Sequence, residues 1–390
     1  MTSPSGMAEQ PEWHTDEFPE LRSAPPWVMA EMVASQPALV APILAGSAAT
    51  ALAQLILDVD ESGEPIVVTG CGTSEHGAMA VAELLDAALR QRGARGGQVE
   101  ARQALEAALD PRAVGLCIAV TDSGGTQATL LALEAARDTG AATAAITANP
   151  DGAAATSVDV AFVTPVRDLA WCHTVAYTSA ILAGAALAAE IAEVDLDADK
   201  IASWLKRAVT PANAEREIAQ SMRGLRLVHV VGSGADRTSA RELALKIEEG
   251  ARRSAVARDL ETLLHGHFVA CGPDTGLIAV LTDSRGGERR WRRAVQGLEA
   301  AARLEMPVAA ILFPESAQAI PDALTPAGRI VVPGRSDPLP PLRSLLGGAA
   351  ALQRLTLALI ADAGVNPDLI RREKAPYREA AALVEDWPDW

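Results

Sequence analysis

The chain of 390 residues is poor in aromatic side chains and in positive charge. Phe, Trp and Tyr make up 3% of the sequence. Lys and Arg number 34 against 50 Asp and Glu, so the formal net charge is −16. Nucleic acids and anionic membrane surfaces attract positively charged proteins, and we therefore expect neither as a partner. An anionic ligand would need a local binding site.

Cysteine is also scarce, and its spacing shows neither a CxxC pair nor another metal-binding pattern. This favours free thiols in a reducing compartment, so we expect a cytoplasmic protein without a bound metal. Residues 1–27 do not resemble a signal peptide, and residues 1–25 are expected to be a partly disordered leader. The apolar run over residues 176–189 contains glycine and is judged too short to span a bilayer. The four cysteines are Cys71, Cys117, Cys172 and Cys271.

Short apolar segments alternate with amphipathic helical patterns along the whole chain. Alternating strands and helices predict an α/β fold, in which helices cover both faces of a parallel sheet. A chain of this length exceeds the usual size of one core, so two domains are expected. Helices are predicted over residues 26–45 and 46–59. In the first half, strands are predicted at residues 66–68, 113–120, 142–146 and 158–163.

Two loops rich in glycine and hydroxyl side chains each follow a predicted strand, and both recur later. The first pair starts at Gly70 and Thr121, and similar loops start at Gly232 and Thr282, 162 and 161 positions further on. A shared offset indicates an internal duplication. We therefore expect two three-layer α/β/α units, over residues 26–210 and 211–390, with a linker near residues 210–225.

The loops of the first copy are suited to holding an anion. A strand that runs through a Gly/Ser/Thr loop into a helix directs backbone N–H groups and hydroxyls toward one point. The second copy instead has Arg285, Glu288, Arg289 and Arg290 near the corresponding place. The first copy is therefore expected to bind the ligand, and its hydroxyl side chains are Thr73, Ser74, Thr121, Ser123 and Thr126.

A lysine and a glutamate share one face of a helix predicted over residues 239–250. Lys246 precedes Glu249 by three positions, so the side chains are neighbours. A partly desolvated carboxylate is a suitable base for moving a proton beside a carbonyl or imine, because its pKa can rise toward working pH. Lys246 could hold the carboxylate ionised or polarise a substrate oxygen. A solvated ion pair on the helix surface is the alternative.

Three stretches together resemble the SIS (sugar isomerase) domain family. Cys71-Gly72-Thr73-Ser74 and residues 121–126 look like its two sugar-phosphate loops. Residues 245–249, followed by His265-Gly266, look like the catalytic segment of tandem-SIS enzymes, with the family's sixteen-residue spacing between Glu249 and His265. These enzymes include the isomerase half of glucosamine-6-phosphate synthase and related aminosugar-phosphate deaminases. The resemblance covers roughly residues 27–390.

The resemblance implies a sugar-phosphate isomerase or an aminosugar-phosphate deaminase that uses no cofactor. It implies that both loops, with Cys71, Gly72 and Asp122 included, bind the sugar phosphate and that Glu249 moves the proton between C1 and C2. It further implies that His265 of a neighbouring subunit opens the sugar ring, in a homodimer with shared active sites. The family's C-terminal tail commonly places a lysine over the substrate. Lys374 is the best match, with Arg371 and Arg372 as competitors.

Two positions depart from the family's pattern. Asp122 lies inside the presumed phosphate loop, where a carboxylate repels phosphate unless it points away or bonds a sugar hydroxyl. His173, in the segment Trp171-Cys172-His173-Thr174, could contact the ligand. Together they indicate an unusual sugar, or one with another anionic group. The remaining alternative is a sugar-phosphate sensor without catalysis, although both Glu249 and His265 are present.

Overall fold

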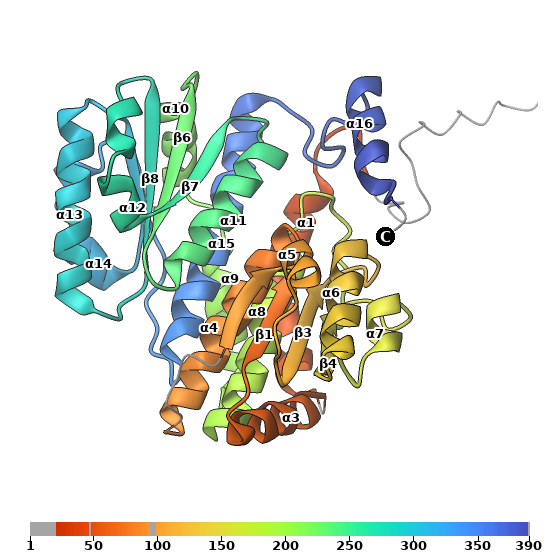
Figure 1. The fold of residues 1–390 in the computed structure, drawn as a ribbon. Coiled ribbons are helices and arrows are strands. Elements are labelled where there is room, and N and C mark those ends of the chain that lie inside the picture. The colour runs from red at the N-terminus through yellow and green to blue at the C-terminus, as the bar shows by residue number, and fades with distance from the viewer. Residues whose placement is uncertain (1–20, 47, 94–98, 389–390) are drawn as a thin grey trace, which may run out of the picture.

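Two units of the same design lie side by side in the computed structural model (Figure 1), which describes residues 21–46, 48–93 and 99–388. Each unit contains one five-stranded parallel sheet. The strand order is β2-β1-β3-β4-β5 in the first unit and β10-β9-β8-β6-β7 in the second, which is the same order read from the opposite edge. The predicted α/β duplication is confirmed. The expected leader falls mostly on residues 1–20, which lie outside the described residues.

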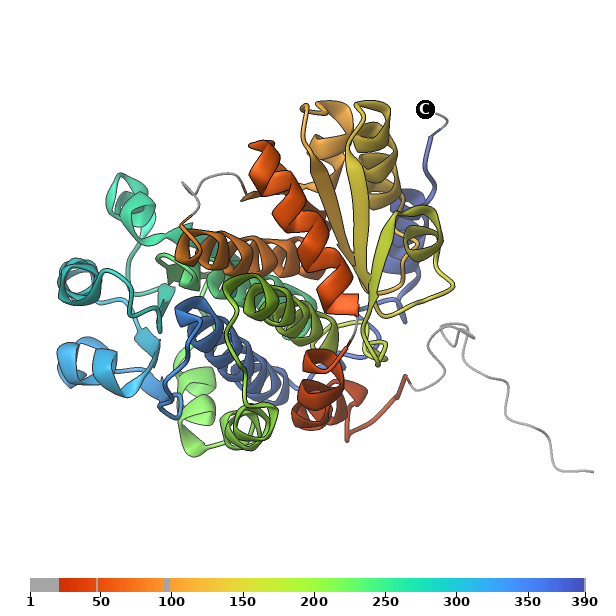
Figure 2. The same ribbon diagram turned by 90° about the horizontal axis from the view of Figure 1, so that it is seen from below.

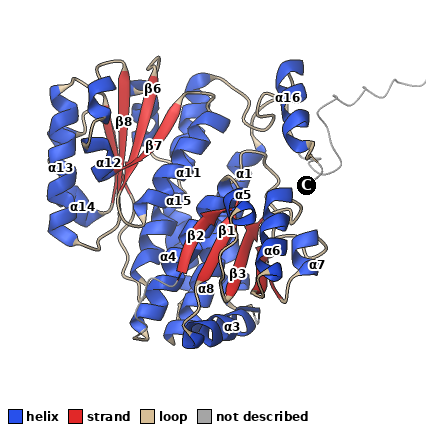
Figure 3. Ribbon diagram, viewed as in Figure 1, coloured by secondary structure: helices blue, strands red, loops and turns tan. Residues whose placement is uncertain are grey.

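The first unit alternates strands and helices (Figure 3), as the hydrophobic pattern predicts. Its elements are α1 (Val28–Ser35), the 3₁₀ helix η1 (Gln36–Leu39), α2 (Val40–Leu44), α3 (Ala48–Ser62), β1 (Ile66–Gly70), α4 (Thr73–Gln91), β2 (Val99–Gln103), α5 (Ala104–Leu109), β3 (Leu116–Thr121), α6 (Gln127–Asp138), β4 (Ala142–Thr147), α7 (Ala153–Ser157), β5 (Val160–Val163), α8 (Val175–Ala192) and α9 (Ala198–Ala208).

The second unit repeats this order from its first strand onward. Its elements are α10 (Asn213–Ser221), β6 (Leu227–Gly232), α11 (Asp236–Glu249), β7 (Ala255–Asp259), α12 (Leu260–Leu264), η2 (His267–Ala270), β8 (Thr275–Leu281), α13 (Gly287–Arg303), β9 (Val308–Leu312), α14 (Pro314–Ala319), η3 (Asp322–Leu324), β10 (Gly328–Val331), α15 (Pro340–Ala363) and α16 (Ala375–Glu385).

Two segments differ from the sequence-based expectation. The helix predicted over residues 26–45 is interrupted by η1. Pro37 lies in the first turn of η1, and proline lacks the N–H that would continue the hydrogen bonding of the preceding helix. The expected linker at residues 210–225 contains α10, which packs against α15 and β10. Ile218 of α10 is completely buried, so this segment belongs to the core of the second unit.

One hydrophobic core joins the two units. Helices α4, α8, α11 and α15 pack against one another in the layer between the two sheets (Figure 2). Buried side chains from both units form a single cluster there, including Leu84, Ile181, Leu243 and Leu352. The largest core is therefore shared by the two units, while smaller hydrophobic clusters belong to each unit alone. The position of each sheet depends on the other through the shared core.

The helices α8 and α15 are apolar because the rest of the protein surrounds them. Both are long and apolar enough to cross a membrane by length and composition, with mean hydropathies of 1.6 and 1.4. However, 78% and 83% of their apolar windows are buried inside the protein. The expectation that the first of these segments is too short to span was wrong, because α8 extends over 18 residues.

In the second unit, Asp236 occupies the place that Ser74 has in the first. Its carboxylate accepts hydrogen bonds from the backbone N–H groups of Thr282, at 2.7 Å, and Asp283, at 2.8 Å. Burial and the nearby charge of Asp283 raise the pKa of Asp236 to about 7. Backbone N–H groups that could hold an external anion are thus bonded to the chain's own carboxylate.

Asp283, in the second loop of this unit, bonds to the first loop. Its carboxylate accepts a hydrogen bond from the backbone N–H of Ala235 at 2.9 Å, and it pairs with Arg285 at 2.7 Å and with Arg290 at 2.8 Å. The arginines that replace hydroxyl groups in this copy are therefore used internally. This arrangement supports the expectation that the first unit is the one that binds a ligand.

We expect Asp283→Ala to destabilise the protein by about 3 kcal/mol, because breaking a buried ion pair strands its remaining partners. Arg285 and Arg290 lose their shared carboxylate, and the Ala235 N–H loses its acceptor. The measurement is the urea unfolding midpoint followed by circular dichroism. Asp58→Ala, at an exposed position on α3, should change stability by less than about 0.5 kcal/mol. Equal midpoints for the two variants would contradict the prediction.

Candidate active site

The two loops of the first unit meet because the strands that precede them are neighbours. β1 and β3 pair in parallel, so their carboxyl ends, at Gly70 and Thr121, lie at the same edge of the sheet. A Cβ atom on Gly70 would lie 2.5 Å from the carbonyl oxygen of Ser74, which leaves room only for glycine. Gly72 has a φ of 57°, a conformation that glycine adopts without strain. We call residues 71–74 and 121–126 the cradle.

Hydrogen bonds within the second cradle loop fix its shape. The Thr121 hydroxyl accepts from the N–H of Gly124 at 3.2 Å, and the Ser123 hydroxyl accepts from the N–H of Gly125 at 3.3 Å. The side chain of Asn149, which follows β4, donates to the Ser123 carbonyl at 2.8 Å. Thr126 is exposed at the start of α6. The loop is thus held rigidly while its turn stays open at the surface.

The other predicted cradle residues lie on the first loop and behind it. Cys71 is half-buried, with its sulfur 3.9 Å from the Thr129 hydroxyl, and Gly72 is exposed. Ser74 lines a polar cavity of about 10 Å³ together with Thr121, Asp122 and Ser179, which is room for about one water molecule. The structure therefore brings the predicted cradle residues of both loops together.

The carboxylate of Asp122 points toward the segment that connects β5 to α8. Both of its oxygens lie 3.3 Å from the backbone nitrogen of Asp168. Burial raises the pKa of Asp122 to about 6, and the negative charge of Asp168 adds to this effect, while His173 opposes it. Asp122 thus bonds to a neighbouring segment, an orientation that leaves the loop's hydroxyl groups clear of the carboxylate.

His173 joins the same group of charges. Its Nδ1 lies 3.7 Å from the carboxylate of the fully buried Asp168. Burial disfavours the charged imidazole, but the nearby negative charge of Asp168 outweighs it and raises the pKa of His173 above its ordinary value. Lys246 of α11 also acts on this pKa and lowers it. His173 therefore lies between the back of the cradle and the residues of α11.

The predicted base and its lysine form a buried ion pair at the end of α11. The Lys246 ammonium contacts the Glu249 carboxylate and lies 3.6 Å from Glu242. Lys246 has no exposed side-chain surface, whereas Glu249 is 29% exposed. Burial would lower the pKa of Lys246, but the two carboxylates outweigh it and raise the pKa, so the ammonium stays charged. This burial rules out a solvated surface pair.

Two residues that the sequence analysis missed connect this pair to the cradle. Glu242 accepts a hydrogen bond from the Thr73 hydroxyl at 3.3 Å, and its other oxygen lies 2.7 Å from Nδ1 of His76. Burial raises the pKa of Glu242, but Lys246 and His76 outweigh it and hold the pKa below its ordinary value. The sequence contained one signal for Glu242, because it lies four positions before Lys246 on the same helical face.

The residue expected to open the ring lies outside this network. His265, at the end of α12, is 72% exposed, and its Nε2 contacts Glu261 of the same helix at 2.8 Å. Arg293 of α13 binds that glutamate at 2.7 Å as well. A single chain therefore does not bring His265 to Glu249, and its arrival from a neighbouring subunit stays a prediction.

Lys374 is exposed where α16 begins, and it is absent from the lining of the pocket beside Glu249. That pocket has a volume of about 500 Å³, and its lining includes Glu249, Arg252, Arg371 and Tyr377. The family-like tail thus reaches the candidate base, but the structure brings Arg371 rather than Lys374 to the pocket.

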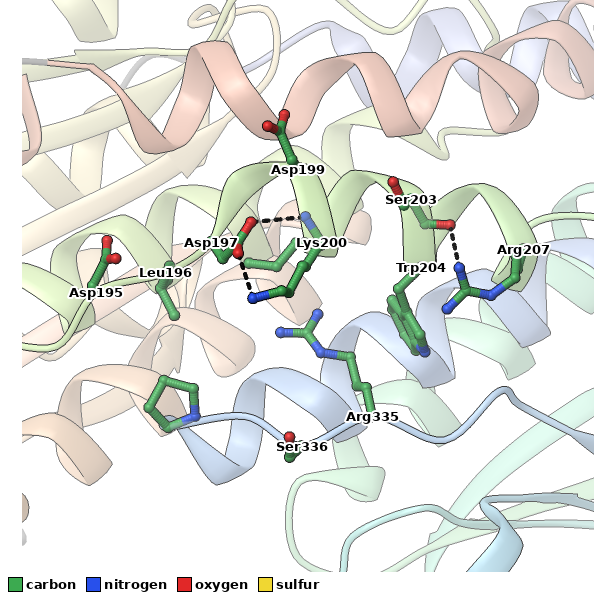
Figure 4. Close-up of a pocket in the computed structure, with 12 residues that line it drawn as sticks. Asp195, Leu196, Asp197, Asp199, Lys200, Ser203, Trp204, Arg207, Arg335 and Ser336 are labelled. Atoms are coloured by element: carbon green, nitrogen blue, oxygen red, sulfur yellow. Dashed lines mark hydrogen bonds and ion pairs between the residues drawn. The ribbon is translucent and has the colours of Figure 1, made fainter.

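A larger groove, of about 610 Å³, lies between α9 and the segment before α15 (Figure 4). Arg335 projects toward α9 there, with its guanidinium 5.1 Å from the centre of the Trp204 ring, and Asp197 pairs with Lys200. None of the lining residues belongs to the cradle or to the Glu249 network.

Among the residues that the structure describes, no group of three or more His, Cys, Asp or Glu side chains is placed to hold a metal ion.

Comparison with known proteins agrees with this arrangement. Residues 62–189 match the family model described as SIS domain. No curated protein sequence matches the chain. The C-terminal domain of glucosamine-fructose-6-phosphate aminotransferase from Francisella tularensis is similar in structure, with a TM-score of 0.72 and 18% identity, over 88% of this chain and 98% of that one.

Two further solved structures share the fold over most of the chain. Tagatose-6-phosphate ketose/aldose isomerase from Escherichia coli has a TM-score of 0.70 and 18% identity, over 90% of this chain and 96% of that one. Glucosamine-6-phosphate deaminase from Thermotoga maritima has a TM-score of 0.64 and 16% identity, over 87% of this chain and 96% of that one. The matched model covers the cradle, and the second unit repeats the fold of the first. The first unit therefore contains an SIS domain, and the second unit repeats its fold.

Proposed function

We propose that this protein is a sugar-phosphate aldose–ketose isomerase or an aminosugar-phosphate deaminase. The observation that carries the proposal is the buried series of contacts from Thr73 of the cradle through Glu242 and Lys246 to Glu249. These contacts join the hydroxyl-lined cradle at one end to a half-buried carboxylate at the other, which supports the proposal. The similar solved structures include a ketose/aldose isomerase and a glucosamine-6-phosphate deaminase, which supports the same class.

In the proposed reaction, the cradle holds the phosphate and Glu249 acts at the carbonyl end. Glu249 takes the proton from C2 of the open-chain sugar, and the C–H electron pair forms the C1=C2 bond while the C1 carbonyl oxygen becomes negative. Return of the proton to C1, together with movement of the C2 hydroxyl proton to the C1 oxygen, forms the C2 carbonyl and gives the ketose. With an amino group at C2, the same transfer gives an imine at C2, and addition of water then releases ammonia.

Lys246 is proposed to keep Glu249 ionised, since its ammonium is charged and buried against that carboxylate. His265 of a second subunit is proposed to open the sugar ring by moving a proton between the ring oxygen and O1. We therefore propose a homodimer with shared sites and, because the four cysteines are free thiols, a cytoplasmic location. Gel filtration with light scattering tests the first assignment.

Isomerase and deaminase are separated by their products. Purified protein is incubated with glucosamine 6-phosphate and with a panel of hexose 6-phosphates, and ammonia and ketose are measured in parallel. Ammonia from the aminosugar identifies a deaminase, and ketose without ammonia identifies an isomerase. Ligand binding without either product would instead support a sugar-phosphate sensor that keeps the fold and lacks the reaction.

The first prediction for this site concerns the base. Glu249→Gln should lower kcat by about 10²–10⁴-fold, the usual contribution of a general base, because the amide cannot accept the C2 proton. Calorimetry should show sugar-phosphate binding within about threefold of wild type, since the cradle is unchanged. Glu299→Gln, on the exposed side of α13, is the matched control. Retained turnover in Glu249→Gln would remove Glu249 from the reaction.

The second prediction concerns the pH dependence of anion binding. Asp122 has its pKa raised to about 6, so it is largely neutral at pH 5 and charged at pH 8, where it repels an anion in the cradle. Asp122→Asn should therefore bind sulfate about three- to tenfold more tightly than wild type at pH 8, a difference of ~1 kcal/mol, and equally at pH 5.

Sulfate is the suitable probe because it keeps its two charges across this range, whereas phosphate titrates. The Asp122 charge also raises the pKa of His173, so the same comparison is repeated in a His173→Gln background to isolate the effect of Asp122 itself. The asparagine side chain can still accept the N–H of Asp168, and the connection should keep its shape. Equal affinities at pH 8 would show that the Asp122 charge does not reach the cradle.

A further inference from the structure

The segment that follows α15 crosses from the second unit to the first. We call residues 366–374 the tail. Arg252, directly after α11, donates to the carbonyl of Asn366 at 2.8 Å and pairs with Glu373 at 3.2 Å. Arg372 stacks over the ring of Trp171 at 4.8 Å, in the connection that leads to α8. The tail is therefore attached both to the end of the Glu249 helix and to the segment that carries His173.

The three cations of the tail have different surroundings. Arg372 stacks on the ring of Trp171 and forms an ion pair with Glu385 at 2.8 Å. Lys374 is exposed to solvent. Arg371 donates to the hydroxyl of Tyr377 at 2.7 Å and stacks on its ring at 5.0 Å, and in the described part of the chain no carboxylate pairs with it. Its Nε is buried and has no hydrogen-bond partner.

The backbone around Arg371 is held in an uncommon conformation. Ile370 and Arg371 have φ values of 37° and 65°, and Arg252 on the facing segment has 57°. Left-handed conformations are unfavourable for non-glycine residues, and they persist where the surroundings require them. Arg252 and both tail residues line the pocket that also contains Glu249. Three of the five non-glycine residues with a positive φ in the described part of the chain therefore lie at this pocket.

Charge balance in the pocket leaves Arg371 available to a ligand. Among the charged residues that line the pocket, Glu249 pairs with Lys246, Arg252 with Glu373 and Arg253 with Asp362. The guanidinium of Arg371 therefore has a positive charge and buried hydrogen-bonding capacity that the protein itself does not use. A planar guanidinium with free N–H groups binds an oxyanion through two parallel hydrogen bonds.

We propose that Arg371, and not Lys374, is the substrate-contacting cation of the tail, and that it binds the C1 oxygen of the open-chain sugar opposite Glu249. The inference rests on the proposed function. When the C2 proton moves to Glu249, the electron pair moves into the C1=C2 bond and the C1 oxygen gains the negative charge. Arg371 stabilises this enediolate until the proton is returned to C1.

The first test compares kinetics of three variants. Arg371→Gln should lower kcat by about 10²–10³-fold, the scale of losing one donor to a developing oxyanion, and Arg371→Lys should recover part of it. Lys374→Gln should stay within about threefold of wild type. A large loss in Lys374→Gln together with wild-type kcat in Arg371→Gln would overturn the assignment. Far-UV circular dichroism confirms that each variant is folded.

The second test does not depend on turnover. A five-carbon aldonic acid 5-phosphate carries a carboxylate that mimics the planar enediolate, and inorganic phosphate probes the cradle alone. Calorimetry should show that Arg371→Gln weakens aldonate binding by at least about tenfold and leaves phosphate binding unchanged. Equal aldonate affinity in wild type and Arg371→Gln would refute the role of Arg371 alone. A wild type that binds neither the aldonate nor any sugar phosphate would refute the proposed function, and this inference with it.

Discussion

The structure of the candidate site depends on one buried ammonium group. Lys246 has no exposed surface, and a buried charge is tolerated only when it is paired. Glu242 and Glu249 supply the pairing from the same helix, and Thr73 and His76 of the first unit complete the bonding of Glu242. One electrostatic requirement thus fixes the cradle of one unit relative to the base of the other. The shared hydrophobic core gives this group its rigidity.

The two copies show how one backbone can be used in two ways. In the first unit, the strand ends lead to glycine and hydroxyl groups, and the single carboxylate, Asp122, is turned toward a neighbouring segment. In the second unit, Asp236 and Asp283 accept the loop N–H groups, and two arginines neutralise Asp283. A few loop positions therefore distinguish an open loop pair lined by hydroxyl groups from one that is bonded internally.

The sequence determined the features that are encoded locally. Short apolar strands, amphipathic helices and the repeated loop offset gave the parallel sheets, the duplication and the cradle, because each depends on residues close together in the chain. The spacing of Lys246 and Glu249 likewise placed them on one helical face. The interruption at residues 36–39 and the helix at residues 213–221 were missed, since a proline in a 3₁₀ turn and a short amphipathic segment give weak signals.

Only the tertiary structure decided which polar groups meet. His76 and Glu242 are 166 positions apart, and Arg371 lies far along the chain from Glu249, so no spacing rule could pair them. The direction of the Asp122 carboxylate likewise depends on the connection that follows β5. Such contacts arise when packed helices bring distant segments together and burial forces each charge to find a partner. The sequence alone therefore determined the scaffold and the residue types of the site, and the packing of the two units decided their partners.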